Sequence, residues 1–359
     1  MTDNSNLDDP QLFQQLDPEG MLACLHEMPQ LCQQAWQMAM GFKLPPDYST
    51  VNRMVVLGMG GSAIGGDLVS SLAAPEGKLP VIVYRDYDLP AFVDDKTLVI
   101  ASSYSGMTEE ILSSFEQALE TKAKKLVITT GGKLRSLAEE NGIPVFTFDY
   151  RAQPRAALPF GLMPILGFLQ QLGFVSDKSQ DVVETTQILQ ELSPRINEGV
   201  LQSSNPAKQL AQRLFARLPV IYGEGLLAEV AHRWKTQLNE NSKAWAFYEV
   251  FPELDHNAVV GYQFPEELAG KMMVVLLRSA SPRKRIHLRY QATCQLLDQA
   301  RVSYQAVDSC GTSPLSQMMS LVLFGDYVSY YLAMLYRIDP SPVKAIDYLK
   351  EQLARDKGK

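Results

Sequence analysis

One stretch, VVLGMGGSAIGGD at residues 55–67, constrains the fold more than any other part of the chain. It predicts a buried strand that runs through a glycine-rich turn into a helix beginning near Ser62. Glycines at such a turn let backbone N–H groups approach an anion closely, and the helix N-terminus adds unpaired N–H groups and the positive end of its dipole. The stretch therefore predicts a phosphate-binding turn. The alternative is a turn that needs glycine only for tight packing.

Two kinds of phosphate ligand fit this turn. Gly58, Gly60 and Ala63 match the degenerate G-x-G-x-x-G/A spacing of dinucleotide-binding folds, and Asp86 follows at a plausible distance after another predicted strand. The same backbone geometry also suits the phosphate of a sugar ester. The turn alone leaves both ligands open.

A second loop favours the sugar phosphate. The stretch VIASSYSGMTEEIL, residues 99–112, places several hydroxyl side chains around Gly106, between a predicted buried strand and a helix start. Parallel strands bring their carboxyl ends to one edge of a sheet, so the two loops can converge. Helix capping needs fewer hydroxyls than this loop holds, and dinucleotide domains need no serine-rich second loop. The predicted phosphate ligands are Gly60, Gly61, Ser62, Ser103, Ser105 and Thr108.

The order of predicted elements indicates an α/β fold with two tandem doubly wound, Rossmann-like parallel sheets and additional helices at both ends. The stretch LPVIYGEGLLAEVAHRW, residues 218–234, repeats the strand, glycine turn and helix of the first half without its serine and paired glycines. We therefore expect one phosphate site rather than two. The expected segments are an N-terminal helical segment at 1–45, a first subdomain at 46–200 and a second subdomain with the C-terminal helices at 201–359.

Length and charge exclude several classes of protein. The chain of 359 residues is longer than one core usually holds, which agrees with two similar halves. Its net charge of −7 argues against a nucleic-acid partner. The N-terminal residues lack the basic and apolar regions of a signal peptide, and we expect no apolar run to be long enough to cross a bilayer. A cytoplasmic protein without a membrane partner is expected.

The cysteines and histidines predict neither a metal site nor a disulfide. The cysteines show no C-x-x-C spacing and no nearby histidine pair, so we interpret them as reduced thiols. Three of the histidines have helical neighbourhoods and are interpreted as structural. The methionines and tyrosines of the apolar stretch 313–336 are expected in the core or a subunit interface. These cysteines and histidines are Cys24, Cys32, Cys294, Cys310, His26, His232 and His287.

At this point the chain resembles a known family. GMGGSAIGGD followed by SSYSGMTEE resembles the sugar isomerase (SIS) domain, a phosphosugar-binding module of isomerases, amidotransferases and regulators. Further stretches are similar to the bifunctional phosphoglucose/phosphomannose isomerases. They are PRAAL at 154–158, NENSK at 239–243, FPELDHNAVVGY at 251–262 and DPSPVKAIDYLK at 339–350.

The resemblance implies an activity and an assembly. The implied activity is the interconversion of glucose 6-phosphate and fructose 6-phosphate through a cis-enediol. Mannose 6-phosphate is implied as a further substrate. No cofactor or metal is implied. The resemblance also implies a homodimer whose active site lies at the subunit interface.

Such a reaction needs a base that moves a proton between two adjacent carbons. Glu240 is the base that the resemblance implies, whereas a glutamate at a helix end is by itself more often solvated. We expect it at the sheet edge that faces the ligand. We also expect the flanking Asn239 and Asn241 to orient its carboxylate by hydrogen bonds.

The reaction also needs groups that open the sugar ring and stabilise the enediolate. The resemblance implies that His256 opens the ring, from its own or from a neighbouring subunit, although a lone loop histidine is more often structural. Lys344 is implied in ring opening or in binding substrate oxygens, where the ordinary alternative is a solvated terminal-helix lysine. Arg155 is implied as the cation beside the enediolate.

Three other functions stay open from the sequence. A NAD-dependent dehydrogenase is supported by the glycine spacing of the first turn. A non-catalytic phosphosugar-binding regulator would share the SIS module, but would have no use for Glu240, His256 and Lys344 together. Glucosamine-phosphate synthase is the weakest, because its glutaminase half uses an N-terminal cysteine and this chain begins Met1-Thr2.

Overall fold

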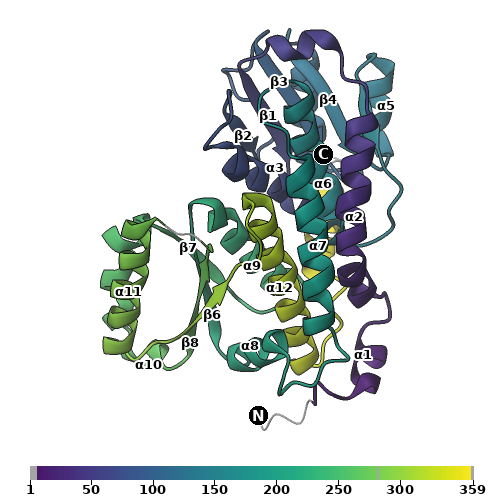
Figure 1. The fold of residues 1–359 in the computed structure, drawn as a ribbon. Helices are drawn as coiled ribbons and strands as arrows, with labels where there is room; N and C mark the ends of the chain where they lie inside the picture. The colour runs from purple at the N-terminus through teal and green to yellow at the C-terminus, as the bar shows by residue number, and fades with distance from the viewer. Residues whose placement is uncertain (1–5, 281–282, 357–359) are drawn as a thin grey trace.

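The computed structural model describes residues 6–280 and 283–356. Their strands form two separate sheets, and the strand pairings within each sheet are parallel. Helices cover both faces of these sheets (Figure 1). The predicted α/β class with two tandem doubly wound sheets is confirmed. Of the predicted segments, residues 1–5 and 357–359 lie outside the described residues.

The first sheet follows a pair of N-terminal helices, α1 (Pro10–Leu16) and α2 (Met21–Gly41). Its strands are β1 (Arg53–Gly58), β2 (Val81–Tyr84), β3 (Thr97–Ser102), β4 (Lys124–Thr129) and β5 (Val145–Thr147). They lie in the order β2-β1-β3-β4-β5, a doubly wound order whose switch point falls between β1 and β3. Gly58 at the end of β1 pairs with Ser102 at the end of β3. The two predicted phosphate loops therefore start side by side.

Helices enclose the first sheet. On one face lie α2, α3 (Gly60–Ala73) and α6 (Leu158–Gln171), and on the other lie α4 (Glu109–Leu119) and α5 (Gly132–Glu140). Successive strand residues point to opposite faces, so Val56 belongs to the first core and Val55 to the second. Burial on both faces requires apolar residues at every strand position, which is why these strands are visible in the sequence as continuous apolar runs.

The second sheet follows α7 (Ser179–Ile196) and α8 (Pro206–Leu214). Its strands are β6 (Leu218–Glu224), β7 (Phe247–Phe251), β8 (Met272–Arg278) and β9 (Ser303–Asp308), in the order β7-β6-β8-β9. The helices between them are α9 (Ala228–Glu240), α10 (Glu266–Ala269) and α11 (Lys284–Gln299). The sequence analysis did not predict β7. It is an edge strand in which Phe251 alone is buried, so it lacks the apolar run that marks the other strands.

Helix α12 (Pro314–Leu335), which precedes α13 (Lys344–Asp356), is the buried axis of the second half. It packs against α7, α8 and α9, and Trp234 of α9 lies so close that a β-carbon at Gly325 would come within 2.3 Å of the indole. At 22 residues it is long and apolar enough to cross a bilayer, so the expectation that no run has this length is wrong. Its apolar window is, however, entirely buried inside the protein. The placement of its methionines and tyrosines in the core is confirmed.

One continuous core joins the two sheets. Helices α2, α6, α7, α9 and α12 all contribute to it, and Figure 1 shows α2, α7 and α12 side by side along the molecule. The strands of the first sheet precede residue 200 and those of the second follow it. The predicted bounds between the subdomains stay a prediction.

Candidate active site

The two predicted phosphate loops meet at the switch point of the first sheet. The Oγ atom of Ser62, in the first turn of α3, accepts a hydrogen bond of 3.2 Å from the backbone N–H of Tyr104 in the loop after β3. Open α/β sheets bind ligands at this crevice, outside the carboxyl ends of the strands. The structure therefore brings together the two loops that the sequence analysis selected.

The glycines after β1 have two different roles. Gly60 has a φ of +49°, and a β-carbon there would meet open space, so backbone conformation requires this glycine. Gly61 and Gly65 are required by packing instead. A β-carbon at Gly61 would lie 3.1 Å from the α-carbon of Arg155, and one at Gly65 would lie 2.6 Å from the carbonyl carbon of Gly161. Tight packing therefore explains part of this motif.

The hydroxyl side chains of the second loop also have two different roles. Ser103 is buried, and its Oγ contacts the Oγ1 of Thr108 at 2.8 Å and accepts from the N–H of Gly106 at 3.1 Å. Ser105 is exposed, and its Oγ accepts from the N–H of Met107. Thr108 is half-buried at the N-cap of α4, where its side chain makes no capping hydrogen bond. Ser103 therefore shapes the loop, whereas Ser105, Thr108 and Ser62 border the open edge.

Arg155 links this edge to the second half of the molecule. It is 2% exposed, lies in a short 3-10 helix at Pro154–Ala157, and has its backbone against Gly61. Its Nε donates to Oδ1 of Asn241 at 2.6 Å, and its Nη2 donates to the carbonyls of Pro340 and Ser341 at 2.7 and 2.8 Å. Burial lowers the pKa of the guanidinium, while the Glu240 carboxylate acts in the opposite direction.

The carboxylate of Glu240 lies 3.5 Å from Nη1 of Arg155, and its side chain is 26% exposed. The direction of α9 explains the location of Glu240. Because α9 runs back along the sheet after β6, its last residue returns to the amino-end edge of its own sheet, not to the carboxyl-end edge. Glu240 faces the phosphate loops of the first sheet across Arg155.

The expected role of the flanking asparagines is wrong. Within the described residues, neither amide forms a hydrogen bond with the Glu240 carboxylate. Asn239 donates to the carbonyl of Ala244, and the buried Asn241 accepts from Arg155 and donates to Ser329. Asn241 therefore orients the cation that lies beside Glu240.

A cavity of about 600 Å³ adjoins Glu240 and brings in Lys344. Lys344 is the exposed first residue of α13. The lining residues come from the end of α9, the loop before α13 and the start of α13; they include Glu240, Lys243, Asp339, Val343 and Lys344. The structure thus brings Lys344 and Glu240 to the same cavity.

Within one chain, His256 does not lie with Glu240, Arg155 and Lys344. It is exposed in a 3-10 helix that follows the carboxyl end of β7, whereas Glu240 precedes the amino end of that strand. A strand from residue 247 to 251 spans about 13 Å. Within the described residues, no hydrogen bond or ion pair joins His256 to Glu240, Arg155 or Lys344.

The second glycine turn carries an acidic residue where the first has none. Glu224 ends β6, and its carboxylate accepts from the hydroxyl of Ser279 at 3.0 Å, just after β8. A carboxylate at this edge disfavours a phosphate dianion. This arrangement supports the expectation of a single phosphate site.

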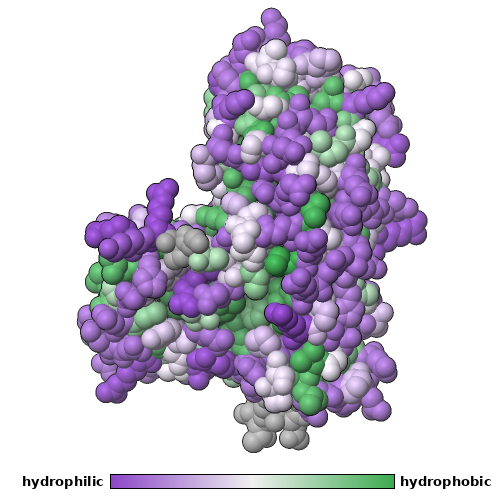
Figure 2. All heavy atoms as spheres, in the orientation of Figure 1, coloured by the Kyte–Doolittle hydropathy of each residue, from purple (hydrophilic) through white to green (hydrophobic). Residues whose placement is uncertain are grey.

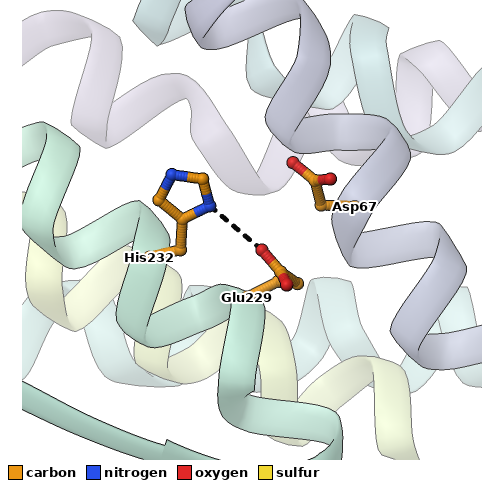
Figure 3. Close-up of side chains that lie close together, drawn as sticks. All are labelled: Asp67, Glu229 and His232. Carbon is orange, nitrogen blue, oxygen red and sulfur yellow. Dashed lines mark hydrogen bonds and ion pairs between the residues drawn. The ribbon is translucent and has the colours of Figure 1, made fainter. Parts of the chain in front are cut away.

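A further group of charged residues joins α3 to α9. Ligand atoms of Asp67, Glu229 and His232 lie within 4.8 Å of one another (Figure 3). Arg85 pairs with Asp67, His232 contacts Glu229 at 3.0 Å, and Tyr248 stacks on the imidazole of His232. The chain's own groups thus partner these carboxylates, and we interpret the cluster as an ion-pair junction. Sequence spacing could not reveal it, because Asp67 and Arg85 lie far from the α9 pair along the chain.

Other residues of the site were also missed. Arg233 and Asp326 form a buried ion pair, with a distance of 2.8 Å, and Arg233 donates to the carbonyl of Arg155. Lys243 lines the cavity and contacts the carbonyl of Glu240. Lys243 stood inside the NENSK motif, which was the one available signal.

Several known proteins are similar to this chain. Residues 203–353 match the family model described as the bacterial phospho-glucose isomerase C-terminal SIS domain. A bifunctional phosphoglucose/phosphomannose isomerase of Caldicellulosiruptor bescii is 42% identical over 94% of this chain and 100% of that protein. One of the same name from Aquifex aeolicus is 37% identical over 86% of this chain and 92% of that protein.

Among solved structures, a hypothetical protein of Thermus thermophilus has the same fold. It has a TM-score of 0.73 at 18% identity and covers 97% of this chain and 93% of that one. The identity to the Caldicellulosiruptor and Aquifex proteins extends over most of each chain. The chain therefore belongs to the family of bifunctional phosphoglucose/phosphomannose isomerases.

Proposed function

We propose that this protein interconverts glucose 6-phosphate and mannose 6-phosphate with fructose 6-phosphate. One observation carries the proposal. The Glu240 carboxylate lies 3.5 Å from Arg155, whose backbone packs on the phosphate-loop residue Gly61. The names of the related proteins from Caldicellulosiruptor and Aquifex support both aldose phosphates as substrates.

In this proposal the phosphate binds at the switch point of the first sheet. The amides at the N-terminus of α3 and the hydroxyls of Ser62, Ser105 and Thr108 donate to its oxygens. The buried Ser103 holds the second loop in shape through Gly106 and Thr108. Because the Glu224 carboxylate disfavours a phosphate at the second turn, the proposal assigns the phosphate to the first turn.

Glu240 would act as the base. Its carboxylate removes the proton from C2 of the open-chain aldose. The C–H electron pair forms the C1–C2 double bond, and the π electrons of the C1 carbonyl move to O1, which gives a cis-enediolate. The same proton, or one from solvent, is then returned to C1, while the hydroxyl proton of O2 moves to O1, so that C2 becomes the carbonyl of the ketose. Because C2 is planar in the enediolate, the glucose and mannose epimers give the same intermediate. Arg155, whose backbone packs on Gly61 of the phosphate loop, stabilises the developing negative charge.

Lys344 and His256 would open the ring. Opening moves a proton from the anomeric hydroxyl to the ring oxygen, which needs a donor and an acceptor near those atoms. Lys344 lines the cavity beside Glu240. His256 follows the far end of β7, so we propose that the His256 of a neighbouring subunit serves each site.

The apolar surface supports a homodimer. Trp245, just before β7, and Val260 and Phe264, which follow His256 in the chain, are 74%, 72% and 76% exposed. Helix α13 exposes further apolar side chains: Ile346, Tyr348, Leu349 and Leu353. The face drawn in Figure 2 is mostly hydrophilic, with apolar residues gathered in the recess beside the α11 side of the second half. Exposed apolar clusters of this kind mark subunit contacts, and we propose a cytoplasmic homodimer.

A dehydrogenase and a regulator are less well supported. Asp86, which would contact a ribose in a dinucleotide domain, is exposed and accepts from the N–H of Tyr87. A regulator has no need of a carboxylate and a cation paired beside the phosphate loops. The absence of a cofactor and of a metal stays part of the proposal.

The experiment is a coupled assay of wild type with both aldose phosphates and fructose 6-phosphate. We expect turnover of all three, and a loss in kcat of about 100- to 10,000-fold for Glu240→Gln. Glu191→Gln, at an exposed position on α7, is the matched control and should keep full activity. Unchanged turnover in Glu240→Gln would remove the base, and reduction of NAD by any of these sugars would favour a dehydrogenase instead.

A further inference from the structure

Lys243 has an unusual place beside Glu240. It follows α9 with a φ of +52°, a backbone conformation that a lysine rarely adopts. Its Nζ turns back and lies within 3.3 Å of backbone carbonyls from two separate segments. These carbonyls belong to Glu240 at 2.8 Å, Asn241 at 3.3 Å, Asp339 at 3.1 Å and Pro340 at 2.8 Å.

Two of these carbonyls belong to the candidate active site. One is the carbonyl of Glu240 itself. The other, that of Pro340, also accepts from Nη2 of Arg155 at 2.7 Å, so Lys243 and Arg155 share an acceptor. The segment of Asp339 and Pro340 leads directly into α13, which begins at Lys344. Lys243 thus connects the backbone that carries the base to the segment that carries Arg155's partner and Lys344.

Lys243 makes more hydrogen bonds than a lysine that only caps the C-terminus of its helix. A capping lysine satisfies carbonyls of its own helix end, where the negative end of the dipole attracts a cation. Lys243 makes that contact with Glu240 and Asn241, and in addition reaches a loop nearly a hundred residues later in the chain. An ammonium group has three protons to donate, so four carbonyl acceptors favour its charged form.

We propose that Lys243 is a positioning residue for the reaction, which holds Glu240, Arg155 and the start of α13 in one arrangement through its protonated Nζ. The proposal rests on the isomerase function proposed above. Loss of the proton would remove donors from the carbonyl cluster and loosen the 339–340 segment from α9. Displacement of a base or cation by a fraction of an ångström to an ångström costs rate strongly, whereas binding of a distant phosphate is little affected.

The charges around Lys243 make this arrangement sensitive to pH. Partial desolvation of this otherwise exposed residue and the positive charge of Arg155 lower the pKa of Lys243 to about 8, while the carboxylates of Asp339 and Glu240 act in the opposite direction. Lys344 lines the same cavity. One N–H donor is therefore lost from the carbonyl cluster as the pH rises through about 8.

The test compares Lys243→Met and Lys243→Arg with wild type in steady-state kinetics on fructose 6-phosphate from pH 6 to 10. We expect Lys243→Met to lose about 10- to 100-fold in kcat with a KM within about threefold of wild type. The decline of kcat above about pH 8 in wild type should be absent in Lys243→Met, and should move to higher pH in Lys243→Arg, which stays charged. Lys271→Met, at an exposed lysine before β8, is the control.

Circular dichroism and inhibition by inorganic phosphate accompany each variant, so that misfolding is separated from mispositioning. A folded Lys243→Met with the wild-type kcat, or with the wild-type decline above pH 8, would overturn the proposal. If Lys243→Met does not fold, an unshifted profile in Lys243→Arg overturns it as well. Absence of isomerase activity in wild type itself would instead reject the proposed function.

Discussion

The guanidinium of Arg155 lies 3.5 Å from the carboxylate of Glu240, although the two residues come from opposite halves of the chain. Arg155 belongs to the segment that packs on Gly61 in the predicted phosphate turn, and Glu240 ends a helix of the second half. Because Arg155 is almost fully buried and hydrogen-bonded to Asn241, Pro340 and Ser341, its position is fixed before any substrate binds. Such preorganised charge is an effective way to stabilise an anionic transition state.

We predict that substitutions in the phosphate loops weaken substrate binding without slowing the chemical step. Ser62→Ala and Ser105→Ala should each raise KM and weaken inhibition by inorganic phosphate by about ten- to a hundredfold, because a hydrogen bond to a charged group contributes about 1.5–3 kcal/mol. Their kcat should change little. Ser113→Ala, on the same α4 side of the first half, is the control. Equal phosphate inhibition in wild type and both variants would place the phosphate elsewhere.

The separation of Glu240 and His256 along β7 predicts complementation between subunits. Glu240→Gln and His256→Ala dimers should each be nearly inactive. A heterodimer purified by two different tags should recover about half of wild-type activity, because in a two-fold dimer one site carries both substitutions and the other carries neither. If each site takes both residues from one chain, the heterodimer will be as inactive as its parents.

The crossing of α3 and α6 predicts a stability defect at Gly65. A β-carbon there would lie 2.6 Å from the carbonyl carbon of Gly161, so Gly65→Ala must push backbone apart. We expect a loss of about 1–3 kcal/mol in the free energy of unfolding, measured by urea denaturation. Gly270→Ala, where an added β-carbon meets nothing within 4 Å, should change stability by less than about 0.5 kcal/mol. Equal stabilities for the two variants would contradict this packing.

Glu184 predicts a pH-dependent contribution to stability at the start of α12. Burial raises its pKa, but hydrogen bonds from Thr312 and Ser313 outweigh burial and lower the pKa to about 2, from an ordinary value of 4.5. A carboxyl whose folded pKa is lowered stabilises the fold above its unfolded pKa and loses that contribution as the pH falls toward the folded value.

Glu184→Gln should therefore be less stable than wild type by about 1 kcal/mol at pH 7. The difference should shrink between pH 4.5 and 2. Thermal unfolding of both proteins across this range checks the prediction. A difference that stays constant with pH would mean that the ionised carboxylate is not the stabilising form.

The sequence by itself determined the two parallel sheets and the two loops that meet at the edge of the first sheet, and it left the α12 side chains between the core and a subunit interface. These features depend on local patterns: apolar runs for strands buried on both faces, glycine at Gly60 where φ is positive, and hydroxyls clustered around Gly106. The edge strand β7 was not predicted, because its partial exposure removes the apolar run that marks a buried strand. The motif resemblance supplied Glu240 and Arg155 as candidates, but not their contact.

Tertiary structure decided how the halves meet. A helix after a strand returns to the opposite edge of its sheet, so Glu240 faces the first sheet rather than its own carboxyl-end edge, and His256 lies beyond the other end of β7. The four carbonyls around Lys243 come from segments that only folding brings together. Pattern in a sequence reports which face of an element is buried, whereas the partner on that face is chosen by packing of the whole chain.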